Sequence, residues 1–304
     1  MINVRCEICA STNTEEVTIR RSLDYVICHS CGHCLLSPGT STLEEICASS
    51  QKKYFGESTI LIEAGESPLE EELMAQRRGI VSEFVKPKSR ILEVGPGAGA
   101  VLSWLNNQGH MVTAVEESAA LGRVLESVTG TSIIVGGFEQ NGLPAASHDV
   151  FCSFHVIEHV LDPRAHLLEA ARIVRPGGLA FVATPNASSW EQRIFRRLSS
   201  NFDSAHLRVF SQKSLERLST DCGWHILRSE TPEYTSGWLR VASKAVRMVR
   251  GEDEEATAGK YGAGMSRKAR RILTALAWLT WPLRAAQRQL KGGNEIFLVL
   301  QRNT

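Results

Sequence analysis

The chain has 304 residues, of which 43% are hydrophobic and 22% charged, and its formal net charge is +1. This balance favours a soluble globular protein with one core of ordinary domain size plus smaller appendages. The first residues, MINVRCEICASTN, lack a basic stretch followed by an apolar one, so we expect no secretory signal and a cytoplasmic location. The charge is uneven along the chain, because residues 190–290 hold 18 Lys and Arg against 10 Asp and Glu.

The N-terminal segment, residues 1–40, is rich in cysteine and contains short β-like stretches. Two Cys-x-x-Cys pairs stand eighteen residues apart, namely Cys6, Cys9, Cys28 and Cys31. Each pair lets two thiolates converge from one tight turn, and two pairs complete a tetrahedral zinc site of the structural type. The spacing therefore predicts a zinc ribbon, whose metal holds together a core too small to fold alone.

Other metal-binding side chains crowd the second pair, and three of them are alternative ligands: His29, His33 and Cys34. The remaining thiols, Cys47, Cys152 and Cys222, are expected to be ordinary core or surface residues. Clustered cysteines of this kind are typical of metal binding in a reducing compartment rather than of disulfides.

Helical spacing follows from residues 43 to 54 and from 69 to 85, which predicts a helical linker or lid over 41–88. Apolar runs then alternate with helix-like segments, beginning with RILEVG, MVTAVE, TSIIVG, DVFCSF and GLAFVATP. This alternation predicts a mostly parallel sheet covered on both faces, in a domain spanning 89–304. The last two strands, GWHILRSE and NEIFLVLQR, are expected to form an antiparallel hairpin interrupted by a helical insertion at about 232–292.

A glycine-rich turn, Glu93-Val-Gly95-Pro-Gly97-Ala-Gly99, ends the first of these apolar strands. Glycines there allow backbone to approach a ligand closely, and the next helix presents its N-terminus to that ligand. Gly95, Gly97 and Ala100 also satisfy a dinucleotide pattern, with Glu116 about twenty residues on as the ribose-binding acid. From the residues alone, a nicotinamide or flavin enzyme and a bare structural turn both remain alternatives.

The stretch ILEVGPGAGAVLSWLNNQGHMVTAVEES resembles motifs I and II of class I S-adenosylmethionine-dependent methyltransferases. The stretch HDVFCSFHVIEHVLDPRAHLLEAARIVRPGGLAFVATPN is similar to the fourth strand, the following helix and the fifth strand of that family. The stretch AHLRVFSQKSLERLSTDCGW resembles a histidine-containing segment of the ubiquinone-type enzymes. The cysteine-rich front resembles the zinc-binding leader of some bacterial sugar methyltransferases, so the resemblance covers nearly all of residues 1–230.

The resemblance implies a Rossmann-like class I fold and S-adenosylmethionine as cofactor. It implies that Glu93 holds the cofactor's ammonium group, that Gly95, Gly97 and Gly99 let the backbone lie against it, and that Glu116 binds the ribose hydroxyls. A carboxylate can accept two hydrogen bonds at once, which suits a diol. Gly137 stands where the family often has an aspartate against adenine, so the adenine contacts are expected from backbone amides, Phe138 and Glu139.

A polar cluster follows the fourth strand, at the sheet edge where ligands of open α/β folds bind. His155, Glu158 and His159 are spaced so that a helical segment would place them on one side. Either His155 or His159 acts as a general base oriented by Glu158, or these residues and His206 bind Mg or Mn, as a similar motif in small-RNA methyltransferases implies. The third alternative is that they only cap and pack the next helix.

The insertion combines apolar stripes with Arg and Lys in GWLRVASKAVRMVRG and SRKARRILTALAWLTWPLRAAQRQLK. This pattern predicts either a helical lid over the site or peripheral contact with the inner membrane face, and a nucleic-acid partner is not expected. The leading functional hypothesis is O-methylation of a glycan or another polar small molecule. An NAD(P)- or flavin-dependent oxidoreductase and a catalytically silent zinc-module adaptor are the alternatives.

Overall fold

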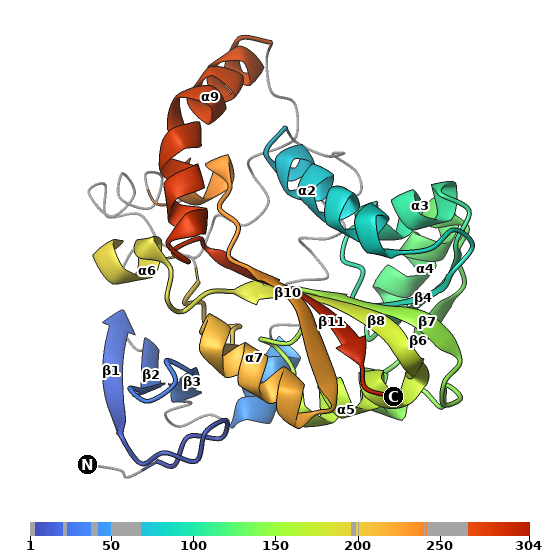
Figure 1. Ribbon diagram of the computed structural model, residues 1–304, viewed down its shortest axis with the longest axis horizontal. Helices are drawn as coiled ribbons and strands as arrows, with labels where there is room; N and C mark the ends of the chain where they lie inside the picture. Colours follow the sequence, from blue (N-terminus) through green and yellow to red (C-terminus); the bar gives the residue numbers. More distant parts are fainter. Residues whose placement is uncertain are drawn as a thin grey trace.

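The computed structural model describes residues 4–20, 23–37, 42–49, 68–195, 199, 201–239, 241 and 267–304. Within these residues the chain forms two sheets, one of seven strands and one of four. Figure 1 shows the large sheet at the centre of the molecule and the small one beside it, near the N-terminus.

The seven-stranded sheet has the order β10-β11-β8-β7-β4-β5-β6. The five strands from β8 to β6 in this order pair in parallel. By contrast, β11 pairs antiparallel with both β8 and β10. This is the Rossmann-like class I methyltransferase sheet with a final antiparallel hairpin, as predicted. The strands are β4 (Arg90–Val94), β5 (Met111–Glu116), β6 (Ile133–Val135), β7 (His148–Phe154), β8 (Val174–Pro185), β10 (Trp224–Glu230) and β11 (Glu295–Arg302).

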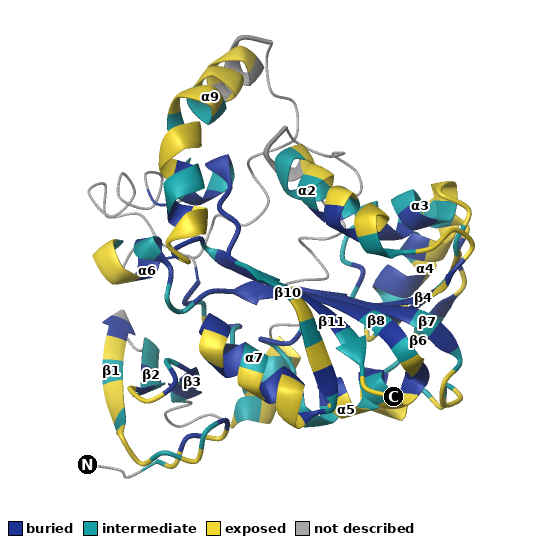
Figure 2. Cartoon of the chain, in the orientation of Figure 1, coloured by how far each residue is buried: buried dark blue, intermediate teal, exposed yellow. Residues whose placement is uncertain are grey.

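Helices cover both faces of this sheet, so its inner strands β4, β7, β8 and β11 are mostly buried, whereas β5, β6 and β10 are partly exposed (Figure 2). In Figure 1 one group of helices lies above the sheet and the other below it. The first group is α2 (Pro68–Phe84), α3 (Ala100–Asn107) and α4 (Ala119–Thr129). The second group is α5 (Pro163–Ile173) and α7 (Gln212–Asp221).

Local sequence explains where the helices near the candidate site begin. Asp162 caps α5 by accepting hydrogen bonds from the backbone amides of Arg164 and Ala165, and Pro163 occupies the first turn, where no amide is needed. Ser211 and Ser214 form a reciprocal capping box at the start of α7. These caps fix the ends of the loops that carry the polar cluster.

The four-stranded sheet has the order β1-β2-β3-β9. Its first three strands come from the cysteine-rich segment, and the fourth comes from the part of the chain that also forms the large sheet. They are β1 (Thr14–Arg20), β2 (Leu23–Cys28), β3 (Cys34–Ser37) and β9 (Arg208–Val209). The division into domains at residues 40 and 88 remains a prediction, and the pairing of β3 with β9 joins the two parts.

The insertion contains α9 (Arg267–Gln289), which extends away from the body of the protein in Figure 1. A short helix at 235–239 precedes it, and the predicted helix from 69 to 85 corresponds to α2. Residues 50–67 and 242–266, on which parts of the predicted linker and insertion fall, lie outside the described residues. Among the described helices, none is both long enough and apolar enough to cross a membrane.

Candidate functional site

The glycine turn at the end of β4 adopts the conformations that only glycine tolerates easily. Gly95, Gly97 and Gly99 all have left-handed φ values, of 61°, 56° and 78°. A Cβ added to Gly95 would lie 2.7 Å from Val156 Cγ2, whereas one added to Gly97 would meet no atom within 4 Å. The turn is therefore packed against the histidine segment at Gly95 and open at Gly97.

Glu93 lies in β4 just before this turn and is only 3% exposed. Its Oε2 is buried and has no hydrogen-bond partner among the described residues. Burial raises the pKa of this carboxyl to about 8, although the charge of Arg77 opposes the shift. A buried carboxyl without a partner is costly, so this group is suited to a cationic ligand.

Glu116 ends β5, the next strand in the sheet, at the same edge. Its Oε1 accepts a hydrogen bond of 2.8 Å from the backbone amide of Ser118, and burial raises its pKa. This bond fixes the carboxylate at the strand end, as a diol-binding group requires.

The two residues after Gly137, Phe138 and Glu139, differ in burial. The Phe138 ring is buried in the core, with its centroid 5.4 Å from that of Phe151 and 5.0 Å from that of His166. Glu139 is half-exposed and lies 3.3 Å from Nδ1 of His166. The Phe138 ring thus packs inward, so only the backbone of this residue is left for the predicted contact with the cofactor, which stays a prediction.

His155 follows β7 in a left-handed conformation, with φ of 57°. Its Nδ1 lies 3.1 Å from Glu158 Oε1 and its Nε2 lies 2.8 Å from Glu295 Oε2. Burial alone would lower the pKa of His155, but the two carboxylates outweigh it and raise this pKa to about 9. His155 is therefore a cation at neutral pH.

Glu158, His159 and His206 form a compact cluster, with one ligand atom from each residue within 4.8 Å of the others. Residues 157–159 form a turn rather than a helix, because α5 begins only at its cap, Asp162. His159 Nδ1 lies 2.8 Å from the carbonyl oxygen of Ala205. His206 Nδ1 lies 2.9 Å from that of Asn201, and the two imidazole centroids are 4.9 Å apart.

Because a carbonyl oxygen only accepts hydrogen bonds, both contacts require a proton on the Nδ1 of the ring. Burial lowers the pKa of His159 to about 4, so this ring is neutral at pH 7. Burial would raise the pKa of Glu158, but His155 lowers it to about 2. The cluster thus combines a carboxylate with a neutral imidazole, beside the charged His155.

Four further residues, which the sequence did not indicate, belong to this network: Arg77, Thr184, Tyr234 and Glu295. Arg77 Nη2 lies 3.0 Å from Glu295 Oε2, and the Tyr234 hydroxyl donates a 3.1 Å hydrogen bond to Glu295 Oε1. The Thr184 hydroxyl donates to Glu158 Oε2. Of these four, only Arg77 could have been noticed in the sequence, because it is a charged residue on the apolar side of α2, near the buried Ile80 and Val81.

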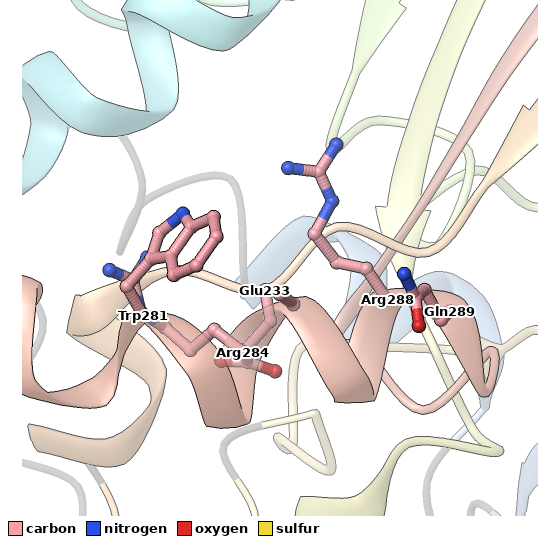
Figure 3. Close-up of a pocket in the computed structure, with 6 residues that line it drawn as sticks. Glu233, Trp281, Arg284, Arg288 and Gln289 are labelled. Atoms are coloured by element: carbon pink, nitrogen blue, oxygen red, sulfur yellow. The ribbon is translucent and has the colours of Figure 1, made fainter.

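A pocket of about 280 Å³ lies at the root of α9, lined by Glu233, Trp281, Arg284, Ala285, Arg288 and Gln289 (Figure 3). Arg284 is paired with Glu72 of α2, and Arg288 with Glu230. The positive charges of the two arginines that line the pocket are thus compensated, and Trp281 contributes an aromatic face to the pocket.

The four ribbon cysteines come together as predicted, with one sulfur from each within 4.8 Å of the others. Sγ of Cys6 and Cys31 are 3.7 Å apart, and Sγ of Cys9 and Cys28 are 3.5 Å apart. A tetrahedral four-thiolate zinc site, with Zn–S bonds of about 2.3 Å, has sulfurs about 3.8 Å apart, so the donor set fits zinc. The alternative ligand His33 instead lies 2.8 Å from Glu7.

A family model described as a methyltransferase domain matches residues 69–229, more than half of the chain. The chain belongs to the S-adenosylmethionine-dependent methyltransferase family. The match covers the glycine turn, the histidine segment and the first of the two hairpin strands.

Relatives agree with this assignment. A probable S-adenosylmethionine-dependent methyltransferase of Mycobacterium tuberculosis is 27% identical over 153 residues, covering 49% of this chain and 54% of that protein. A ubiquinone biosynthesis O-methyltransferase of Cronobacter sakazakii is 32% identical over 109 residues, covering 33% of this chain and 45% of that protein. The chain thus spans about half the length of the relatives that it matches.

Solved structures show the same fold. A 1,6-didemethyltoxoflavin-N1-methyltransferase of Burkholderia thailandensis superposes with a TM-score of 0.53 at 11% identity, covering 95% of this chain and 100% of that one. An S-adenosylmethionine-dependent methyltransferase of Archaeoglobus fulgidus gives a TM-score of 0.51 at 16% identity, covering 76% of this chain and 94% of that one.

Proposed function

We propose that the protein transfers a methyl group from S-adenosylmethionine to a hydroxyl of a glycan or another polar small molecule. One observation carries the proposal: the segment with the histidine cluster packs directly on the cofactor-type glycine turn, through Val156 and Gly95. Val156 lies between His155 and His159 in sequence, so the histidine segment runs beside the turn at which the family holds its methyl donor. The ubiquinone-type relative, named as an O-methyltransferase, supports oxygen as the acceptor atom.

The residues of the turn fit the cofactor. The buried Oε2 of Glu93 has no hydrogen-bond partner among the described residues, so an ammonium group would satisfy it, and the open side of Gly97 leaves room for a ligand. Glu116 is fixed at the adjacent strand end, where it would accept hydrogen bonds from the ribose hydroxyls. When bound, the cofactor would supply a methyl group on a sulfonium; the acceptor oxygen would attack the methyl carbon in line with the C–S bond, which breaks so that S-adenosylhomocysteine leaves as a neutral thioether.

We assign the role of base to His159. The acceptor oxygen gains the methyl group and loses its proton, and the Nε2 lone pair of His159 accepts that proton. The Nδ1 contact with Ala205 fixes this tautomer, and the lowered pKa keeps the ring neutral at pH 7. His155 is already charged, so we assign it the role of holding Glu158 in place.

A bound cation is the second candidate role, favoured by the geometry of the same cluster. Histidines that bind metals commonly donate their other ring N–H to a carbonyl or a carboxylate, as His159 and His206 do here. With Glu158 they would bind Mg or Mn, and the metal would lower the pKa of the acceptor hydroxyl.

Chelation separates the two roles. If His159 acts as the base, turnover survives chelation mild enough to leave the four-thiolate zinc in place, and His206→Ala costs much less than His159→Ala. If a cation acts, chelation abolishes turnover, added Mg or Mn restores it, and both substitutions are equally damaging. Full activity of the His159→Ala, His206→Ala double variant would contradict both assignments.

Cofactor binding tests the reaction class. Calorimetry with S-adenosylmethionine and with NAD should show saturable binding of the first and none of the second. Binding of NAD alone would favour an oxidoreductase, and binding of neither would favour a silent zinc-module adaptor.

The pocket at the root of α9 supports a glycan-like acceptor. Glu233, next to the Tyr234 that contacts Glu295, lines it together with the exposed Trp281. An aromatic face with compensated charges suits a polar, uncharged ring better than an anion. Replacing Trp281 with Ala should raise the KM for the acceptor more than it lowers kcat.

The outer part of α9 supports peripheral contact with an anionic lipid bilayer. Trp278 and Leu279 are 79% and 78% exposed, and Ile272 is also exposed. The helix contains basic residues but no acidic ones, which complements anionic lipid. We expect the protein to sediment with phosphatidylglycerol vesicles but not with phosphatidylcholine vesicles. Undiminished sedimentation of the Trp278→Ser, Leu279→Ser double variant with phosphatidylglycerol would contradict membrane contact through α9.

A further inference from the structure

The ribbon sheet reaches directly to the candidate base cluster. Its last strand, β9, pairs with β3 through Leu35 opposite Arg208. The backbone amide of Leu36 donates a 2.8 Å hydrogen bond to the carbonyl oxygen of Leu207. The two residues that follow His206 are therefore held by the cysteine-rich segment.

Tyr25 of β2 holds the other side of His206. Its side chain is fully buried, and its hydroxyl lies 2.8 Å from the carbonyl oxygen of His206 and 2.9 Å from that of Asp203. The Tyr25 ring also packs edge-on against Phe202, with centroids 4.7 Å apart. The loop that carries His206 is thus bound to the ribbon by one aromatic side chain.

Arg208 connects the first cysteine turn to the His159 turn. It is only 3% exposed, and its Nε and Nη2 donate hydrogen bonds of 2.6 and 3.0 Å to the carboxylate of Glu7, which lies between Cys6 and Cys9. The same guanidinium donates to the carbonyl oxygens of Val160 and Leu161, at 2.6 and 2.9 Å. These carbonyls directly follow the Glu158–His159 turn.

The contacts form one continuous path from the cysteine cluster to both imidazoles. A buried guanidinium bonded to a carboxylate and two carbonyls has few alternative geometries, because each bond that it loses leaves a buried polar group unpaired. Movement of the first cysteine turn would therefore move Glu7 and Arg208, and with them the backbone beside His159.

We propose that the cysteine ribbon positions His159 and His206, with Glu7, Arg208 and Tyr25 as positioning residues. The metal-bound shape of the Cys6–Cys9 turn then sets the geometry of the candidate base. The proposal concerns this geometry and rests on the proposed function only for the consequence in turnover.

Two conservative variants of the full chain test the path separately. Glu7→Gln keeps the shape of the side chain but removes its charge, and Tyr25→Phe removes only the hydroxyl. Glu15→Gln is the matched control, since Glu15 also pairs with a ribbon histidine, His29, but is exposed. Spectra of protein labelled with ¹⁵N-histidine report the Nδ1–H tautomer of His159 and His206, assigned by substituting each histidine.

We expect Glu7→Gln and Tyr25→Phe to keep the zinc content of the unsubstituted protein and its affinity for S-adenosylmethionine within about twofold. Both should shift or broaden the Nδ1–H signals, His206 most in Tyr25→Phe. Methyl transfer should fall about tenfold, in line with the loss of one buried hydrogen bond. Glu15→Gln should change none of these.

Histidine signals unchanged in both variants, as in Glu15→Gln, would overturn the proposal. If Glu7→Gln does not fold, Tyr25→Phe decides alone. The spectra and the cofactor affinity do not require turnover, so an inactive unsubstituted protein would refute the proposed function while the positioning could still be measured.

Discussion

Nε2 of His155 lies 2.8 Å from Oε2 of Glu295, although 140 residues separate them in sequence. The same carboxylate oxygen accepts a 3.0 Å hydrogen bond from Arg77. Burial would raise the pKa of Glu295, but Arg77 and His155 lower it to about 2, so it is a carboxylate at neutral pH. It balances two cations at the sheet edge where the acceptor is expected.

Glu295→Gln should therefore destabilise the fold. It leaves Arg77 without its buried partner, and breaking such a pair costs about 3 to 5 kcal/mol. Urea unfolding measures the change, with Glu230→Gln as a control because Glu230 is a half-exposed partner of Arg288. Equal effects of the two substitutions would show that the Glu295 network contributes little.

Cofactor binding should release a proton at pH 7. With a raised pKa of about 8, Glu93 is mostly protonated below that pH in the free protein, and it must ionise to pair with an ammonium group. Affinity should accordingly increase as pH rises towards 8. Calorimetry in buffers of different ionisation enthalpy counts the protons, and Glu93→Gln should abolish the release; the same release in that variant would assign it to another group.

Glu116→Ala should weaken binding of S-adenosylmethionine about a hundredfold or more. It removes two charge-assisted hydrogen bonds to the ribose, each worth about 1.5 to 3 kcal/mol. Its neighbour Glu117 is exposed, so Glu117→Ala is the matched control. Unchanged affinity of Glu116→Ala by calorimetry would remove this residue from the cofactor site.

One zinc per chain should copurify with the protein. Cys6→Ser or Cys31→Ser should lose it and destabilise the ribbon, because metal binding and folding are coupled in such sites. Cys34 lies in the same ribbon but outside the four-cysteine cluster, so Cys34→Ser should retain the metal. Elemental analysis decides, and a fully folded, metal-free preparation would refute the zinc ribbon.

Much of the fold could be predicted because its signals are local. The apolar runs from Arg90 onward alternate with helical spacing, and the two cysteine pairs specify their own turns. The glycine turn and Glu93 could be proposed as cofactor-binding residues for the same reason, since their motif is contiguous.

The rest depends on contacts between distant segments. Nothing near Glu295 or Arg77 in sequence indicates that both meet His155, and their positions follow from the sheet order. The pairing of β3 with β9 joins segments about 170 residues apart, so the connection from Glu7 to Arg208 has no local signature. Our proposal of His159 rather than His155 as the base also depends on the carboxylates around His155, which only the fold brings together.

Transfer of a labelled methyl group tests the central claim most directly. The protein is incubated with S-adenosylmethionine labelled with tritium in its methyl group and with an extract of its source cells, alongside His159→Ala and the exposed-site control Glu15→Gln. We predict that the protein and Glu15→Gln label a polar small molecule or glycan at oxygen, while His159→Ala does so about 10² to 10⁴ times more slowly. Label that appears at the same rate with His159→Ala, or no label with any of the three proteins, would contradict the account.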